Sequence, residues 1–223
     1  MKRNPNIESA AGITRRAALK YATAGTLIGL GVRAPNGRAA VAVELKPADA
    51  WERTHDRVWL GGEFWANPME DWRVVDGAAE CQSTGGNRSV HSLTHQIANP
   101  AGHFKMSVQL DRVAGEGKDG GAGFRIGIRS EIDEHRSNCF AGKGVNAGIV
   151  DGQLTLGPKT EPLAAVAEMK SVELHLSGTA DGGQVELTLE ATSAETGASL
   201  GKVSHKLPAA EVLGNVALVS NYT

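Results

Sequence analysis

Apolar and polar residues alternate with a period of two along most of the chain after Trp72. In 103–112 the apolar positions are Phe104, Met106, Val108 and Leu110. The same alternation recurs in 124–128, 172–176 and 185–189. A period of two places one side of a strand in a core and the other side in water, as antiparallel sheets allow. The pattern therefore predicts a series of amphipathic β-strands.

Turn residues separate these segments. Asp76-Gly77 and Asp151-Gly152 predict two-residue hairpin turns, because glycine supplies the positive φ that a type I′ turn requires. Further turns are expected at 99–100, 119–121 and 181–183. Glycine accounts for 28 of 223 residues, above its usual share of about 7%, which suits a chain with many turns.

Strands and turns together predict an all-β fold, an antiparallel β-sandwich or jelly roll of about ten short strands. Short helices are expected only at 208–213 and 162–169. We assign the sandwich domain to 72–223 and interpret 41–71 as an N-terminal strap. The chain stops just after the apolar segment 216–219, which predicts that the sandwich lacks a final strand to cover one sheet edge.

The first 40 residues have the pattern of an export signal. A basic stretch containing Arg15 and Arg16 precedes a weakly apolar, glycine-dotted run over 17–32, and small residues follow. The arginine pair indicates the twin-arginine subtype, an address that the twin-arginine export machinery reads. A membrane helix would need roughly 20 apolar residues, and this run is shorter. We therefore expect a periplasmic or extracellular protein with no membrane span after cleavage.

Removing the signal makes the protein acidic. Residues 1–40 hold seven of the 23 basic and one of the 25 acidic residues, so the remainder has 16 basic and 24 acidic residues and a net charge of −8. Nucleic-acid binding needs clustered positive charge, so this composition argues against a nucleic-acid partner. Export permits one disulfide between Cys81 and Cys139, and two buried thiols are the alternative.

All four tryptophans lie within 51–72. They are either flat platforms for sugar rings or packing groups that hold the strap over the sandwich. Each tryptophan buries a large apolar area, which favours the packing interpretation.

Three short motifs match catalytic or cofactor patterns in the wrong structural context. Gly197–Gly201 fits G-x-S-x-G but lies between strands, without the helix of a nucleophile elbow. The G-x-G-x-x-G match at 115–120 precedes a strand, whereas a dinucleotide site needs a helix there. His91 and His95 are expected on a strand, where about 3.3 Å per residue separates them too far for one metal. No metal and no cofactor is predicted.

The segment 131–134, Glu-Ile-Asp-Glu, resembles the start of the catalytic motif of family 16 glycoside hydrolases, which share the concanavalin-like jelly roll. A retaining pair needs two carboxyls about 5–5.5 Å apart on a strand. Here the next alternate residue is His135, so the acid is missing, and the surroundings indicate a loop. A jelly-roll glycoside hydrolase, or a degenerate hydrolase, is the alternative function.

Several segments resemble, in order, the N-terminal concanavalin-like module of exported alkaline phosphatase D-like proteins. They are 65–72, Glu80-Cys81, 86–94, 136–144 and Ala147-Gly148. The resemblance implies a module that precedes a metal-dependent phosphoesterase domain, which lies beyond Thr223 or has been lost. The Asp-x-His, Gly-Asp and Gly-Asn-His clusters of such enzymes do not occur in this sequence. We therefore predict no enzyme activity for this chain and no catalytic residues.

The remaining expectation is a noncatalytic accessory module that binds a ligand, such as a glycan or an anionic surface polymer. Polar residues are dense within the resembling segments, and the predicted ligand set is Asn87, Arg88, His91, Arg136, Asn138 and Lys143. Arginine and lysine donate hydrogen bonds to anionic groups, and arginine can do so bidentately. Alternatively, Arg88 and Arg136 pair with Asp71, Glu80 or Glu134 and only tie loops together.

Overall fold

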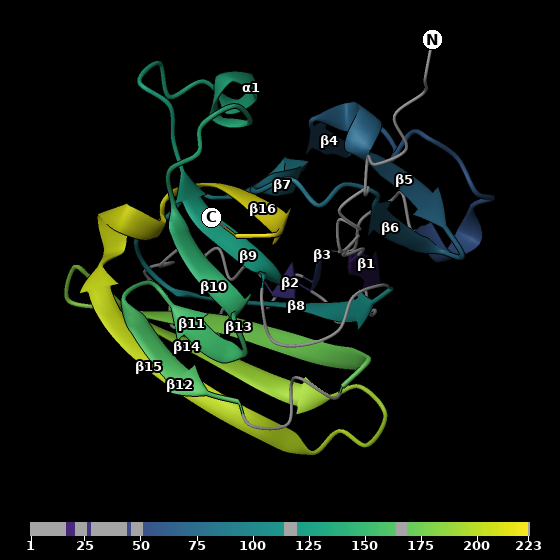
Figure 1. Ribbon diagram of the computed structural model, residues 1–223. Helices are drawn as coiled ribbons and strands as arrows, with labels where there is room; N and C mark the ends of the chain where they lie inside the picture. The colour runs from purple at the N-terminus through teal and green to yellow at the C-terminus, as the bar shows by residue number, and fades with distance from the viewer. Residues whose placement is uncertain are drawn as a thin grey trace, which may run out of the picture.

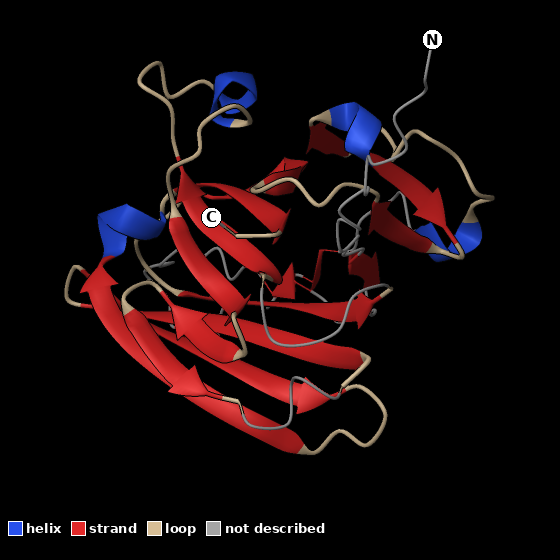
Figure 2. Cartoon of the chain, viewed as in Figure 1, coloured by secondary structure: helices blue, strands red, loops and turns tan. Residues whose placement is uncertain are grey.

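The computed structural model describes residues 51–113, 120–163 and 169–222, and the backbone of short strands at 17–20, 26–27 and 44–45. This part of the chain forms an antiparallel β-sandwich of two seven-stranded sheets (Figures 1 and 2), which confirms the predicted fold class. A further pair of strands, β2 (Thr26–Leu27) and β3 (Glu44–Leu45), forms a small ladder of its own.

The first sheet contains the long hairpin strands near the bottom of Figure 1. Its order is β15 (Ser199–Pro208), β14 (Gln184–Ser193), β13 (Ser171–Asp181), β8 (His103–Arg112), β1 (Ala17–Lys20), β6 (Ala78–Cys81) and β5 (Trp72–Val75). The strand β8 has the bounds that the alternation of apolar residues predicts.

The second sheet runs β12 (Lys159–Pro162), β11 (Gln153–Leu156), β10 (Val145–Val150), β9 (Gly121–Ile128), β16 (Gly214–Ser220), β7 (Arg88–Ile97) and β4 (Phe64–Asn67). Four short helical turns lie between strands: η1 (Trp51–Arg53), η2 (Met69–Asp71), α1 (His135–Asn138) and η3 (Ala209–Val212). The last of these confirms a helical turn within 208–213. Of the other predicted helix, 164–168 lies outside the described residues, and Pro162 ends β12.

One apolar core fills the space between the sheets. The alternating residues of β13 and β14, such as Leu174 and Leu187, are fully buried, and they share one cluster with Phe124 and Leu218 of the second sheet. Turn geometry fixes the hairpins, since Asp76 and Gly77 have φ of 47° and 74°, and Asp151 and Gly152 have φ of 47° and 76°. Both predicted type I′ turns are therefore confirmed.

The final strand is in the middle of its sheet. β16 pairs with β9 on one side and β7 on the other, so 216–219 leaves no uncovered edge. The expectation of an exposed edge there was wrong, because β16 crosses back between strands that are remote in sequence. The edges of this sheet are β12 and β4.

The N-terminal strap is joined to the sandwich more closely than the sequence indicates. β4 already belongs to the second sheet, and Trp51 packs on Phe64 with ring centroids 4.7 Å apart. Nε1 of Trp51 donates a 2.8 Å hydrogen bond to the carbonyl of Leu60. Arg15 and Arg16 of the predicted export signal lie outside the described residues. In the described ranges, no helix is long and apolar enough to cross a membrane.

Candidate functional site

A row of paired residues crosses the second sheet from β4 to β10. Trp65 pairs with His91, and His91 pairs with Ala217. Ala217 pairs with Arg125, and Arg125 pairs with Asn146. Directly paired residues point to the same side of a sheet, and their chain neighbours in each strand face the core. These five residues, which we call the outer row, therefore lie on the face of the second sheet that points away from the core.

Arg125 is the central charge of the outer row. It is only 6% exposed. Its Nε donates to Oδ1 of Asn146 at 2.7 Å, and its Nη2 donates to Oδ1 of Asn87 at 2.7 Å. Both partners are neutral amides, and no ion pair joins Arg125 to a carboxylate in the part of the chain that the structure describes. Burial lowers the pKa of Arg125, although arginine stays protonated in proteins.

Tyr222 packs beside this guanidinium. The Arg125 Cζ atom lies 5.9 Å from the centroid of the Tyr222 ring, within the range of a cation–π contact. The Tyr222 hydroxyl donates a 2.7 Å hydrogen bond to the carbonyl of Phe124. A Cβ on Gly123 or Gly148 would come within 2.8 Å of that hydroxyl, so glycine at both positions lets the ring lie across β9 and β10.

His91 is buried next to Arg125 in the outer row. It is 2% exposed, and its Nε2 lies 3.0 Å from Oγ of Ser89. Burial, with smaller contributions from the neighbouring Arg125 and His135, lowers the pKa of His91 to about 4. His91 is therefore neutral at pH 7. Ala217, a small residue of β16, lies between His91 and Arg125 in the outer row.

Three buried ring nitrogens around the outer row have no protein hydrogen-bond partner. They are Nε1 of Trp65, Nδ1 of His91 and Nε2 of His135. Buried polar groups are nearly always hydrogen-bonded, and each unsatisfied group costs about 1–3 kcal/mol. Indole is a donor only, and each imidazole nitrogen can donate in one tautomer. These three nitrogens can donate hydrogen bonds to the oxygen atoms of a ligand that Arg125 attracts by its charge.

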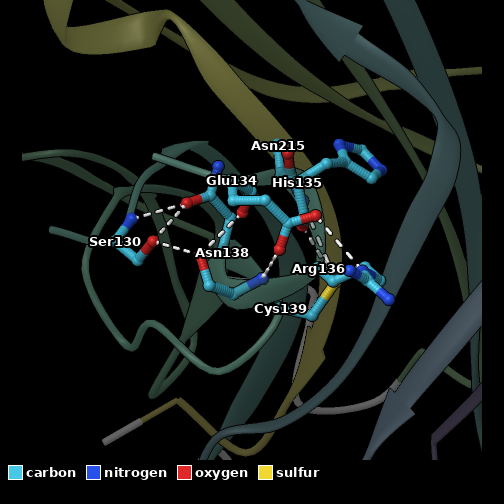
Figure 3. A network of polar contacts seen from close by, with 8 residues as sticks. Ser130, Glu134, His135, Arg136, Asn138, Cys139 and Asn215 are labelled. Atoms are coloured by element: carbon cyan, nitrogen blue, oxygen red, sulfur yellow. Dashed lines mark hydrogen bonds and ion pairs between the residues drawn. The ribbon is translucent and has the colours of Figure 1, made fainter. Parts of the chain in front are cut away.

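The β9–β10 loop (129–144) carries His135 to this site (Figure 3). Glu134 caps α1 by accepting a 3.1 Å hydrogen bond from the Ser137 amide. Nδ2 of Asn215 donates to the His135 carbonyl at 2.9 Å, which ties α1 to β16. Aromatic packing connects the same loop to β4, since the rings of Trp65 and Phe140 lie 5.8 Å apart edge to face. The loop is thus fixed at both β16 and β4.

The structure divides the ligand set predicted from sequence. Asn87 and His91 lie beside Arg125, with Asn87 accepting its hydrogen bond. Asn138 is 2% exposed, and its Oδ1 accepts from the Ser130 amide at 2.6 Å, so it holds the loop together. Lys143 is exposed on the same loop.

The two predicted arginines are both in ion pairs. Arg88 pairs with Asp71, and Arg136 pairs with Glu134 at 3.2 Å. The alternative in which these arginines tie loops together is therefore the arrangement observed. Arg125, a buried arginine that is in no ion pair with a described carboxylate, was missed. It occupies a polar position between Phe124 and Ile126 in a buried strand, where a charge is unusual, and that was the available signal.

The cysteines do not form the disulfide that export would permit. Cys81 and Cys139 are free and buried. Their thiols have different neighbours, the carbonyl of Ser83 at 3.4 Å and the carbonyl of His135 at 3.6 Å. Two buried thiols, the other interpretation, describe the structure.

The tryptophans serve more than one purpose. Trp51 and Trp72 are each 1% exposed and pack in the core, as the strap interpretation predicts. Trp59 is 53% exposed and stacks with Arg57 at 5.4 Å. Trp65 belongs to the outer row.

The remaining motifs lie where the sequence places them. Ser199 of the G-x-S-x-G match begins β15 and donates to Glu190 at 2.9 Å. Glu131 and Asp133 lie exposed in a turn, not on a strand. Residues 115–119 of the G-x-G-x-x-G match lie outside the described residues. Within the described ranges no group of three or more His, Cys, Asp or Glu side chains is placed to hold a metal.

Comparison of the chain with protein-family models, with curated proteins and with solved structures finds no match. Functional inference therefore depends on the outer row and on the sequence itself.

Proposed function

We propose that this chain is an exported, noncatalytic module that binds an anionic group of a glycan or surface polymer at the outer row. The observation that carries the proposal is Arg125, a buried guanidinium whose hydrogen-bond partners are the amides of Asn87 and Asn146. Burying a charge without a counter-ion costs solvation free energy. An anion that binds at Arg125 supplies the missing counter-ion, so its electrostatic attraction to the guanidinium favours binding.

The donor set indicates which chemistry fits. Arginine has five N–H donors, and two of them are donated to Asn87 and Asn146. Carboxylate, phosphate and sulfate oxygens can accept hydrogen bonds from the remaining N–H groups, and the opposite charges make these hydrogen bonds stronger. Trp65, on β4 at the end of the outer row, and Phe140 supply aromatic surface on the same face of the sheet as this charge, which suits a sugar ring. A charged glycan uses both features.

Binding has more support than hydrolysis. General acid–base chemistry on a glycoside needs two carboxyls facing one bond. The carboxylates suggested for that role, Glu131 and Asp133, are exposed in a turn, and Asp133 lies 3.8 Å from Arg129. The outer row itself consists of an indole, an imidazole, a methyl group, a guanidinium and an amide.

The biological setting in this proposal comes from the sequence. The resemblance to exported alkaline phosphatase D-like proteins supports a position outside the cytoplasm and next to a phosphoesterase domain. Trp65, Asn87, His91 and His135 lie within or next to the resembling segments. In this setting the module holds an anionic polymer near an enzyme that acts on phosphate esters.

Binding is tested with polymers that differ in their acidic group. We expect the purified chain to bind one of polygalacturonate, a phosphate-rich teichoic acid or chondroitin sulfate, and not a neutral β-glucan, in isothermal titration at low salt. Arg125→Gln should weaken binding at least about tenfold, because a buried charge-assisted contact is lost. Raising the ionic strength should weaken wild-type binding as well.

Arg129→Gln is the matched control, since Arg129 follows the same strand but is exposed and faces Asp133. Its affinity should stay within about twofold of wild type. Equal losses in the two variants, or no binding of any acidic polymer by the wild type, would refute the proposal. Turnover of a glucan or phosphate ester that Glu131→Gln or Asp133→Asn abolishes would favour the hydrolase.

Export has a separate test. Replacing Arg15 and Arg16 with lysine should leave the precursor in the cytoplasm, because the export receptor reads the arginine pair. Fractionation followed by immunoblotting gives the result. An unchanged periplasmic yield would show that export follows another route.

A further inference from the structure

A cavity of about 310 Å³ lies between the two sheets, below the connection from β7 to β8. Its inner wall consists of buried apolar side chains from both sheets and η3, namely Phe64, Phe104, Phe124, Val185, Val212 and Leu218. Its apolar lining faces the core side of the second sheet, whereas the outer row points to the other side, and Ala217 of β16 is the residue of that row that also borders the cavity. The cavity is therefore a separate feature from the anion site.

An interruption of the sheet forms one wall of this cavity. β16 pairs Asn215 with Gln96 and then Ala217 with His91, so residues 92–95 of β7 oppose a single residue of β16, Val216. The irregularity is a large β-bulge, which bends the strand and breaks its ladder. Ser92, Thr94 and Val216 at the bulge all line the cavity. Local backbone geometry, and not merely loose side-chain packing, thus shapes the space.

The size of the cavity indicates a ligand site. Protein interiors are close-packed, with few voids larger than one water molecule. A volume of about 310 Å³ falls at the lower end of the roughly 300–1,000 Å³ typical of small-molecule sites. The exposed residues at the entrance include the polar side chains of Thr94, Gln96, Asn99 and His103, interspersed with the small or apolar residues 98 and 100–102. The apolar interior suits the alkyl chain of an amphiphile, and the polar side chains at the entrance suit its head group.

We propose that this cavity binds the alkyl chain of a single-chain amphiphile, such as a medium-chain fatty acid, with the polar head at the entrance. The carboxylate or hydroxyl of such a head can accept or donate hydrogen bonds at Thr94, Gln96 and Asn99. The site does not depend on the proposed binding of an anionic polymer.

The test is a chain-length series. Saturated fatty acids from six to sixteen carbons are titrated below their critical micelle concentrations, by displacement of a dansyl-labelled undecanoic acid. We expect affinity to rise about fourfold for each added methylene, because each buried methylene contributes a fixed transfer free energy. The rise should stop once the chain fills the cavity. Affinity that does not depend on chain length would refute the proposal.

Matched variants locate the site. Ala209 of η3 is 2% exposed and lines the cavity, whereas Ala210 is exposed. Ala209→Leu should lower affinity at least about tenfold and shorten the optimal chain, and Ala210→Leu should do neither. Phe104→Leu enlarges the cavity and should lengthen the optimal chain, so it decides the question if Ala209→Leu does not fold. If neither Ala209→Leu nor Phe104→Leu changes the optimal chain length, the assignment of the site to this cavity is contradicted. Arg125→Gln should retain fatty-acid binding.

Discussion

Nη2 of Arg125 lies 2.7 Å from Oδ1 of Asn87, so a buried cation is held by a neutral amide instead of a carboxylate. The amides fix the orientation of the guanidinium but do not neutralise it. A buried ion without a counter-ion costs several kcal/mol of solvation, which short hydrogen bonds to amides offset only in part. The buried charge of Arg125 therefore makes an unfavourable contribution to the free energy of folding, and a bound anion would reduce it.

Arg125→Met should therefore abolish binding of the anionic polymer without loss of stability. We expect the free energy of unfolding to be unchanged or to rise by about 1–2 kcal/mol, since an apolar side chain of similar volume replaces an uncompensated charge. Urea unfolding followed by fluorescence gives the value. A loss of more than about 1 kcal/mol would show that the two amide hydrogen bonds contribute more than the buried charge costs.

Arg73→Met is the contrasting variant. Arg73 lies 3.3 Å from Glu80, whose side chain is 7% exposed, so this substitution removes a cation beside a buried carboxylate. We expect it to lower the free energy of unfolding by about 1–2 kcal/mol, because Arg73 itself is 40% exposed and partly screened by solvent.

The two cysteines should behave as protected thiols. Burial raises the pKa of both Cys81 and Cys139, which keeps them protonated and poorly nucleophilic. We expect iodoacetamide to label the native protein roughly a hundredfold more slowly than the urea-unfolded protein. Both thiols should then react without a reductant, as mass spectrometry can show. A requirement for reductant before labelling would reveal a disulfide.

The fold could be predicted from the sequence because its signals are local. Alternation in β8, β13 and β14 fixes which residues face the core, and Asp-Gly pairs fix the hairpin turns. The position of β16 could not be predicted, since its partners β7 and β9 are more than 80 residues earlier in the chain. Sheet order among remote strands leaves no periodic signal in either strand.

The candidate site depends on the same long-range register. Trp65, His91 and Arg125 form one row only because β4, β7, β16 and β9 pair as they do. The sequence favoured Arg88 and Arg136 because they lie in polar segments, but polar segments also provide the carboxylates that pair with them. A buried arginine inside an apolar strand is the more informative pattern.

Gly127 is expected to be a position where even alanine is not tolerated. It has a φ of 69°, and a Cβ there would overlap the backbone carbonyl of Glu211. Gly127→Ala should lower the free energy of unfolding by about 3 kcal/mol, from left-handed strain together with displacement of η3. Thermal unfolding measures the loss. Gly142→Ala is the control, with no atom within 4 Å of the added Cβ, and should change stability by less than about 0.5 kcal/mol.

His91 should make stability depend on pH. The pKa of His91 is lowered from 6.5 to about 4 in the folded protein, first by burial and then by the charges of Arg125 and His135. Between these values the unfolded chain binds a proton that the folded chain does not, so stability increases with pH across this window. From about one pH unit above 6.5 the imidazole is neutral in both states and contributes no pH dependence.

The expected loss follows from the size of the shift. Acidification from pH 6.5 to pH 4 should cost about 3 kcal/mol at this one residue, because each unit of pKa difference is about 1.4 kcal/mol. His91→Gln, which keeps a polar group near Ser89 but cannot titrate, should flatten the profile in that window. His205→Gln, which removes a half-buried histidine from β15 of the other sheet, is the control for loss of a histidine elsewhere. Urea titrations at half-unit pH steps compare the three proteins. A slope that persists in His91→Gln would assign the acid sensitivity to other groups.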